Sequence, residues 1–325
     1  MLNWIVIGIG DITTRRVIPA IQAEPRSRLY GLVTRDPGKA APYHARSWTT
    51  LEEALSDPAV HAVYVATPVF LHAPQTIQTL RAGRHVLCEK PMAMNEAEAR
   101  SMVEIAEQSG RTFGVAYYRR MYPKVRRAKQ LLDAGVIGQP VVAELTSHGW
   151  FDENETHRSW LLDPAQAGGG PLFDIASHRI DAMNFLFGKV ERACGLLSNA
   201  VHRMAVEDSA TVLVQLPGGV HAVIDVRWNS RIPRDQFRII GEEGEINLDP
   251  LNGPELCVTT RSESRTEHLP PHANLHYPLV ENFVDTVLDN DPTRLACPAE
   301  QGAWVDWVIE QVVGEQVVRS IPLLS

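Results

Sequence analysis

Cysteines, metal-binding patterns and long apolar runs are scarce in this chain. The 325 residues include only four cysteines, with no Cys-x-x-Cys pair and no histidine at zinc spacing, so we expect reduced thiols and no metal ion. The opening run Trp4–Gly8 is too short for a signal peptide, and no segment approaches the roughly 20 apolar residues of a membrane helix. We therefore expect a cytoplasmic protein with no membrane partner.

Blocks of like charge are also missing. The formal net charge is −8, which argues against a nucleic-acid partner. A basic cluster between Arg119 and Lys129 surrounds an amphipathic segment and is interpreted as a solvated helix face. The length allows two domains, because single cores stop growing near roughly 250–300 residues.

The first third of the chain alternates between strand-like and helix-like segments. The strand-like runs are Trp4–Ile9, Leu29–Thr34, Ala62–Thr67, Arg84–Cys88 and Thr112–Ala116. Such βαβ alternation predicts an α/β fold, in which residues 1–119 form a Rossmann domain with a doubly wound parallel sheet.

Beyond residue 120 the pattern changes. A helix is expected over Pro123–Ala134 and another near Leu172–Phe187, and helices at Tyr277–Leu288 and Ala299–Val313 close the chain. Several strand-like runs follow one another without helices between them: Pro140–His148, Val190–Asn199, Thr211–Leu216, Val220–Val226, Phe237–Gly241 and Glu245–Leu248. Glycine-containing turns at 217–219 and 242–244 favour hairpins. Residues 120–325 are therefore expected to form an α+β domain with a large, mostly antiparallel sheet.

A glycine turn follows the first strand. Gly8 permits a tight turn, and Gly10 lets a pyrophosphate approach the backbone at the start of a helix. Thr13 stands where the third glycine of a dinucleotide fingerprint is usual, which loosens the match. An ordinary βα turn is the alternative.

The end of the second strand bears on the choice of cofactor. Arg35 is suited to pair with a 2′-phosphate, and Thr34 can donate a hydroxyl to the same group, which favours NADP over NAD. The alternatives are that Asp36 reaches the ribose of NAD and that Arg35 is an exposed loop residue.

Two further strand ends carry candidate residues. Thr67 and Pro68 are expected to line the cofactor cleft, with His72 as a cofactor contact or a structural hydrogen-bonding residue. Lys90, directly after a buried strand, is expected to stand in the cleft beyond the carboxyl ends of the strands. A surface lysine before a helix-opening proline, Pro91, is the alternative.

Asp174 and His178 lie four residues apart and share one face of a predicted helix, with Asp181 extending the polar stripe. In the functional interpretation, Asp174 orients or charges His178 for proton transfer to a carbonyl or hydroxyl oxygen. In the alternative, the stripe faces solvent.

Together these motifs resemble the Gfo/Idh/MocA family of sugar and cyclitol oxidoreductases over nearly the whole chain. The matching runs are Gly8–Thr13, Thr67-Pro68 with His72, Ala82–Val86 leading into Glu89-Lys90-Pro91, Gly135–Gly138 and Gly168–His178. The chain departs from the family pattern at Thr13, at Ala176, where glycine is common, and at Leu161, where many relatives have an arginine.

The resemblance implies an NAD(P)-dependent hydride transfer to or from a secondary alcohol or ketone of a sugar or polyol. It places Lys90, Asp174 and His178 at the family's catalytic positions and Pro91 at a position that often follows a cis peptide bond. Lys90 would stabilise the reacting oxygen and His178 would move its proton, with Asp174 favouring imidazolium. Together with the motifs above, the expected cofactor contacts are Gly8, Gly10, Asp11, Ile12, Thr34, Arg35, Thr67, Pro68, His72, Glu89, Lys90, Pro91 and Arg119.

Substrate contacts and assembly are also implied. The expected substrate-binding residues are Lys90, Tyr118, His157, Trp160, Asp174 and His178. The likeness favours a homodimer or homotetramer formed through the second sheet. Two other functions stay open: a non-catalytic NADP-binding regulator, and a redox-neutral NAD-dependent glycosidase or lyase.

Overall fold

A computed structural model describes residues 1–154 and 156–314. Its first sheet consists of six parallel strands in the order β3-β2-β1-β4-β5-β6. Their bounds are β1 Leu2–Ile7, β2 Ser27–Val33, β3 Arg46–Trp48, β4 Ala62–Val65, β5 His85–Cys88 and β6 Phe113–Val115. The order reverses at β1, so the prediction of a doubly wound Rossmann sheet is confirmed. The short edge strand β3 was missed.

Helices cover both faces of this sheet, because crossovers that lead in opposite directions from β1 and β4 leave helices on opposite sides. The main ones are α1 Ile18–Ala23, α3 Leu51–Leu55, α4 His72–Arg81 and α5 Glu96–Ser109. Central strands β1 and β4 are almost wholly buried, which explains their nearly continuous apolar sequences.

The second sheet has eight strands in the order β14-β13-β12-β11-β7-β10-β9-β8. Their bounds are β7 Pro140–Trp150, β8 Arg192–Ser198, β9 Ser209–Gln215, β10 His221–Arg227, β11 Asn229–Gly241, β12 Gly244–Asn247, β13 Glu255–Thr260 and β14 Ser264–His268. All neighbours are antiparallel except β10 and β7, so the prediction of a mostly antiparallel sheet is confirmed. Both glycine turns connect antiparallel neighbours, as expected.

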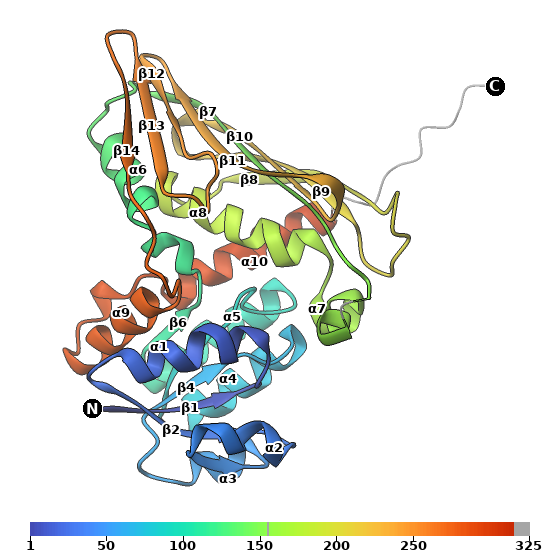
Figure 1. Cartoon of the computed structure of the whole chain (residues 1–325), viewed down its shortest axis with the longest axis vertical. Helices are drawn as coiled ribbons and strands as arrows, with labels where there is room; N and C mark the ends of the chain where they lie inside the picture. Colours follow the sequence, from blue (N-terminus) through green and yellow to red (C-terminus); the bar gives the residue numbers. More distant parts are fainter. Residues whose placement is uncertain (155, 315–325) are drawn as a thin grey trace.

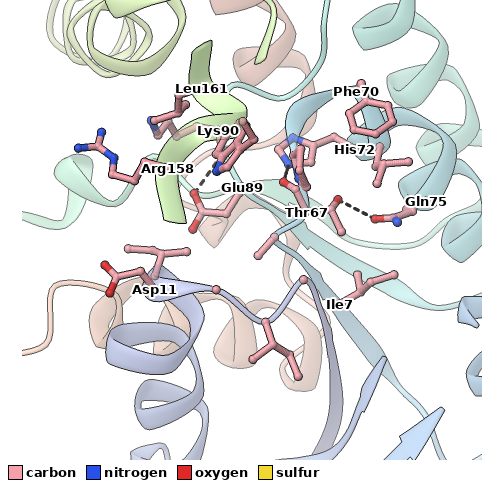
Figure 2. A pocket seen from close by; sticks show the side chains of 18 of the residues that line it. Ile7, Asp11, Thr67, Phe70, His72, Gln75, Glu89, Lys90, Arg158 and Leu161 are labelled. Carbon is pink, nitrogen blue, oxygen red and sulfur yellow. Dashed lines mark hydrogen bonds between the residues drawn. The ribbon is translucent and has the colours of Figure 1, made fainter. Parts of the chain in front are cut away.

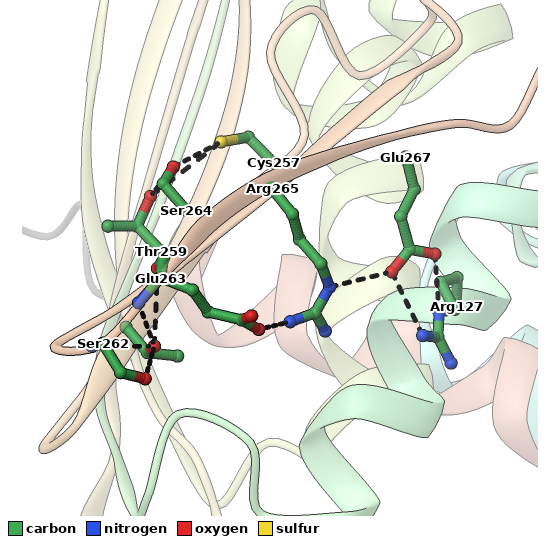
Figure 3. Close-up of polar contacts among 9 residues, drawn as sticks. Arg127, Cys257, Thr259, Ser262, Glu263, Ser264, Arg265 and Glu267 are labelled. Carbon is green, nitrogen blue, oxygen red and sulfur yellow. Dashed lines mark hydrogen bonds and ion pairs between the residues drawn. The ribbon is translucent and has the colours of Figure 1, made fainter.

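The β13–β14 hairpin at the edge of this sheet, which the sequence did not reveal, is tied to helix α6 Pro123–Asp133. Arg127 on α6 donates two hydrogen bonds, of 2.7 and 3.1 Å, to the carboxylate of Glu267 on β14 (Figure 3). Arg265 contacts the same carboxylate at 3.5 Å. The edge strand therefore has a fixed position relative to α6.

Three helices lie between or beside the sheets: α8 Ser177–Phe187, α9 Tyr277–Leu288 and α10 Ala299–Gly314 (Figure 1). Helix α10 contacts helix α5 and strand β6 on the side of the first sheet. It also contacts helix α8 and strand β8 on the side of the second sheet. This helix therefore packs against the first sheet as well as the second. The domain boundary predicted between residues 119 and 120 stays a prediction. Residues 315–325 of the second predicted domain lie outside the described residues.

A buried ion pair joins the two parts close to their junction. The guanidinium of Arg120 donates to both carboxylate oxygens of Asp181 on α8, at 2.6–3.0 Å, and to the carbonyl of Ala296. Asp181 is therefore a buried structural residue, and it does not extend a solvent-facing stripe. Within the described residues, no helix is both long and apolar enough to cross a membrane.

Candidate active site

A cavity of about 1290 Å³ runs from the glycine turn after β1 to the start of α8. Most of the predicted site residues line it: Gly8, Gly10, Asp11, Ile12, Thr34, Arg35, Thr67, Pro68, His72, Glu89, Lys90, Tyr118, Arg119, Trp160, Asp174 and His178. Pro91 does not line the cavity, although its peptide bond to Lys90 is cis, as the resemblance implied. The side chain of His157 lies outside the described residues.

The glycine turn has the geometry that a pyrophosphate site needs. Gly8 has a φ of +91°, and a Cβ there would lie 2.4 Å from the carbonyl oxygen of Ala66, so only glycine fits. At Gly10 a Cβ would meet nothing within 4 Å, which leaves open space beside the backbone. The hydroxyl of Thr13 accepts from the Gly10 N–H and donates to the Gly10 carbonyl, each at 2.8 Å. Thr13, which departs from the fingerprint sequence, thus stabilises the turn through its hydroxyl group.

The second strand ends in a small polar loop at the far end of the cavity. Asp36 uses its carboxylate to accept from the Gly38 N–H at 2.9 Å, at the start of the short helix α2 Pro37–Ala40. Among the described residues, the side chains of Arg35 and Lys39 have no hydrogen-bond or ion-pair partner, although both line the cavity. Two free cations and the Thr34 hydroxyl therefore surround this end.

His72 joins the two loops that follow β4 and β5. One ring nitrogen lies 2.8 Å from the Thr67 carbonyl oxygen (Figure 2), and the other lies 2.9 Å from the Pro91 carbonyl oxygen. Burial lowers the pKa of His72, and the contacts with the two carbonyls offset only part of this effect. The Thr67 hydroxyl donates to Gln75 at 2.8 Å. The structural alternative for His72 matches these contacts.

Lys90 forms an ion pair with Asp174. Its Nζ donates to the Asp174 carboxylate and to the Asp174 carbonyl oxygen, each at 2.8 Å. Arg158 lies 3.4 Å from the other carboxylate oxygen. Burial opposes ionisation of Asp174, but the charges of Lys90 and Arg158 outweigh it and lower the pKa of Asp174. Because an ammonium has three donors, one donor of Lys90 stays available to the cavity.

Glu89, directly before the lysine, is held from the other side. The Tyr64 hydroxyl donates to its carboxylate at 2.8 Å, and a ring nitrogen of His276 lies 3.4 Å from the same oxygen. Burial raises the pKa of Glu89, but the contacts with His276, Tyr64 and Lys90 lower it by more. These contacts fix the strand end that carries Lys90.

His178 is buried, with 7% of its surface exposed, so the alternative of a solvent-facing stripe is wrong. Its ring packs edge-on against Tyr117 and Tyr118, and its Nδ1 has no hydrogen-bond partner among the described residues. The expected orientation of His178 by Asp174 is also wrong, because Lys90 and Arg158 occupy the carboxylate. Burial, followed by the charges of Arg119, Lys90 and Arg179, holds the pKa of His178 well below its usual value. The ring is therefore neutral, not the expected imidazolium.

Several residues at this site were missed from the sequence: Arg158, Arg179, Glu207 and His276. Glu207 is the clearest case, because its carboxylate accepts from the N–H groups of Gly170 and Leu172, each at 2.9 Å. It thereby anchors the glycine run that leads into Asp174. Its isolated position, far along the chain in a loop before β9, gave no signal in the sequence.

Comparison with known proteins agrees with this arrangement. Residues 2–117 match the family described as "Oxidoreductase family, NAD-binding Rossmann fold", and residues 125–247 match the "GFO/IDH/MocA C-terminal domain". Oxidoreductase P35 of Formosa agariphila is 30% identical over 96% of this chain and 98% of its own length. The chain belongs to the Gfo/Idh/MocA family.

Other members of this family are similar over comparable lengths. The 1,5-anhydro-D-fructose reductase of Ensifer adhaerens is 29% identical over 94% of this chain and 93% of its own. Among solved structures, the aldose-aldose oxidoreductase of Caulobacter crescentus, complexed with glycerol, has a TM-score of 0.86 and 25% identity, with 96% of each chain covered.

Membership in the Gfo/Idh/MocA family makes this chain an NAD(P)-dependent oxidoreductase. Its own residues fit a dinucleotide: Gly8 and Gly10 leave the backbone open for a pyrophosphate, and Arg35 and Lys39, which have no partner among the described residues, line the same cavity. Lys90 and His178 lie at the opposite end of the same cavity. A nicotinamide dinucleotide carries its reactive ring at one end and its adenine nucleotide at the other, so it would span the cavity between these two sets of residues.

Proposed function

We propose that this chain transfers a hydride between a nicotinamide cofactor and a secondary alcohol or ketone of a sugar, a cyclitol or a related polyol. The observation that carries the proposal is that Lys90, Asp174 and His178 line the same cavity as the glycine turn. The names of the two relatives reported above, a 1,5-anhydro-D-fructose reductase and an aldose-aldose oxidoreductase, support a carbohydrate substrate.

Each group of the site has a distinct task. The nicotinamide ring, when bound, accepts or supplies the hydride. Lys90 directs its remaining donor to the substrate oxygen and stabilises the negative charge that develops there. Asp174 holds the lysine in place through two hydrogen bonds. His178, whose lowered pKa favours the neutral ring, takes the hydroxyl proton when an alcohol is oxidised and passes it to water; when a ketone is reduced, it first takes up a proton from water and then donates it to the substrate oxygen.

We further propose that NADP is preferred to NAD. Arg35 and Lys39 are unpaired within the described residues, whereas the Asp36 carboxylate is engaged with the backbone at the start of α2. A 2′-phosphate would supply the missing partner for these cations. Removing the Arg35 side chain should therefore lower the affinity for NADPH much more than the affinity for NADH.

The choice of cofactor is tested by fluorescence titration of the wild type and Arg35→Gln with NADPH and NADH. We expect NADPH to lose affinity by about tenfold or more in the variant, as for a lost charge-assisted hydrogen bond, and NADH to change little. Arg238→Gln, which removes an exposed arginine that pairs with Glu245 and does not line the cavity, controls for general charge. Tighter binding of NADH by the wild type would overturn the preference.

The chemistry is tested by a screen of sugars, inositols and related ketones with the preferred cofactor, followed at the absorbance of the reduced nicotinamide. Turnover of at least one compound is expected. Cofactor binding with no turnover would instead indicate a regulator. Copurified cofactor and substrate conversion without net absorbance change would indicate a redox-neutral reaction.

We also propose a homodimer or homotetramer formed through the open face of the second sheet. Leu196 on β8 and Leu213 on β9 expose 70% and 51% of their surfaces, which favours burial against another copy. Sedimentation at micromolar concentration tests this assembly. A mass near 36.1 kDa would reject it.

A further inference from the structure

Arg179, the residue after His178, is almost fully buried at the catalytic end of the cavity, with 2% of its surface exposed. Its Nη2 donates to Asp235 at 2.6 Å and to the Ser147 hydroxyl at 3.2 Å. The Nε and Nη1 atoms have no hydrogen-bond partner among the described residues. Buried donors without partners are costly, so this side chain is only partly satisfied by the protein itself.

A second guanidinium faces the same space. Arg119 lies over the ring of Tyr118, with 4.9 Å between its Cζ and the ring centroid, and its Nε and Nη1 are also buried without partners. Burial and then the charge of Arg119 lower the pKa of Arg179 to about 10. Both guanidinium groups line the cavity, and the Tyr118 ring under Arg119 contacts the ring of His178, the residue next to Arg179. An anion held by both groups would offset their like charges.

At the catalytic end of the cavity, the nearby carboxylates do not balance all of the positive side chains. Lys90 and Arg158 share the carboxylate of Asp174, and Arg179 has that of Asp235, but Arg119 has no carboxylate partner within the described part of the chain. Glu89, the other acid here, is engaged by Tyr64 and His276. A bound monoanion would balance the charge of Arg119.

We propose that the substrate carries a carboxylate, held by Arg119 and Arg179, while its reacting hydroxyl or keto group lies against Lys90 and His178. This inference rests on the proposed function and narrows its substrate to polyhydroxy acids such as uronates. It assigns Arg119 to the substrate, where the sequence had assigned it to the cofactor. Ser147 and Asn252 line the same end and are suited to bind the remaining hydroxyl groups.

The test compares D-glucuronate with D-glucose, which differ only by a carboxylate in place of a hydroxymethyl group. Calorimetric titrations are run on the protein with and without saturating NADPH, for the wild type, Arg119→Met, Arg179→Met and Arg179→Lys. We expect the wild type to bind glucuronate at least about tenfold more tightly than glucose, as for a charge-assisted contact. Either methionine variant should lose most of that preference.

Arg238→Met is the matched control, because Arg238 is exposed on β11 and pairs with Glu245, and it does not line the cavity. It should keep the full preference. Arg179→Met leaves Asp235 without its cation, so circular dichroism and thermal unfolding accompany every titration. If that variant fails to fold, Arg119→Met and Arg179→Lys still decide the question.

Three outcomes would overturn the inference: no binding of glucuronate, equal binding of glucose and glucuronate, or a preference that persists in both Arg119→Met and the folded Arg179 variants. D-glucose 6-phosphate is titrated as well. If it binds more tightly than glucuronate, the site recognises a phosphate and not a carboxylate. NADPH affinity is measured separately. Failure to bind both NADPH and NADH would end the proposed function, whereas a preference for glucuronate in the cofactor-free protein would still support the anion site.

Discussion

Lys90 and Asp174 are 84 positions apart in the sequence, yet the lysine Nζ lies 2.8 Å from both the carboxylate and the backbone carbonyl of the aspartate. The contact joins the end of β5 in the first sheet to the start of the helical segment before α8, which packs against the second sheet. Any shift between the two parts would therefore move the ammonium relative to the cofactor site. The ion pair sets the position from which Lys90 acts.

Replacing Lys90 by methionine should abolish most turnover without emptying the cofactor site. We expect kcat to fall by about 100- to 1000-fold, as when one donor to a developing oxyanion is removed. The NADPH affinity should change little, because the glycine turn is untouched. Stopped-flow kinetics and NADPH titration of the same preparation measure both quantities.

Lys129→Met, which removes a half-buried lysine on α6 that pairs with Asp133, controls for the loss of one surface charge. Lys90→Arg keeps a charge but changes its shape and should restore only part of the rate. If Lys90→Met retained wild-type kcat on a compound that the wild type oxidises, the assigned role of the lysine would be wrong.

His178→Asn tests proton transfer. Loss of a positioned acid or base should lower kcat by about 100- to 10,000-fold. Since burial and three nearby cations hold the pKa of His178 well below 6.5, alcohol oxidation by the wild type should show no loss of rate from this group as the pH falls from 8 to 6.5. A pH profile with an inflection near 6.5 that disappears in His178→Asn would contradict the neutral ring.

The order of the Rossmann elements could be predicted from the sequence, because each central strand is a short apolar run with glycine or proline nearby. The glycine turn could also be predicted from the sequence, because the position of Gly8 admits only glycine: a Cβ there would clash with the loop after β4. Strands β13 and β14 were missed because they are partly exposed, and polar residues such as Thr259 and Ser264 interrupt their apolar pattern.

The candidate catalytic residues predicted from the sequence all line the cavity, but the partners of their side chains were not predicted. Helical spacing placed Asp174 and His178 on one face and suggested that they contact each other. That spacing contains no information about Lys90, whose charge attracts the carboxylate across the cavity. Arg179 was overlooked for a similar reason: its burial depends on a contact with Asp235 on β11, which lies 56 residues later in the chain.

Thr13→Val should weaken the turn that a pyrophosphate would contact. The substitution keeps the shape of the buried side chain but leaves the Gly10 N–H and carbonyl without their hydroxyl partner. We expect the free energy of unfolding to fall by about 1–3 kcal/mol, and NADPH to bind less tightly. Thr13→Ser keeps the hydroxyl and should behave like the wild type in urea denaturation and in NADPH titration. Equal effects of valine and serine would show that the hydroxyl is irrelevant.

His85, at the start of β5, should make stability depend on pH in a defined window. Burial, followed by the charges of Arg111 and His61, lowers its pKa to about 4, and its Nδ1 accepts from the Thr112 N–H. The unfolded chain protonates this histidine near 6.5, whereas the folded protein keeps it neutral, so the unfolded state binds more protons between these values.

The free energy of unfolding should therefore decrease as the pH falls from about 6.5 to about 4, by at most roughly 3 kcal/mol from His85 alone. His85→Gln, which keeps an acceptor for Thr112, should remove that part of the decrease. Urea denaturation at pH 7, 5.5 and 4.5 measures the difference between wild type and variant, with the exposed His221→Gln as the control. The prediction fails if the difference stays constant across this range, because a histidine with an ordinary pKa in the folded state contributes no such dependence.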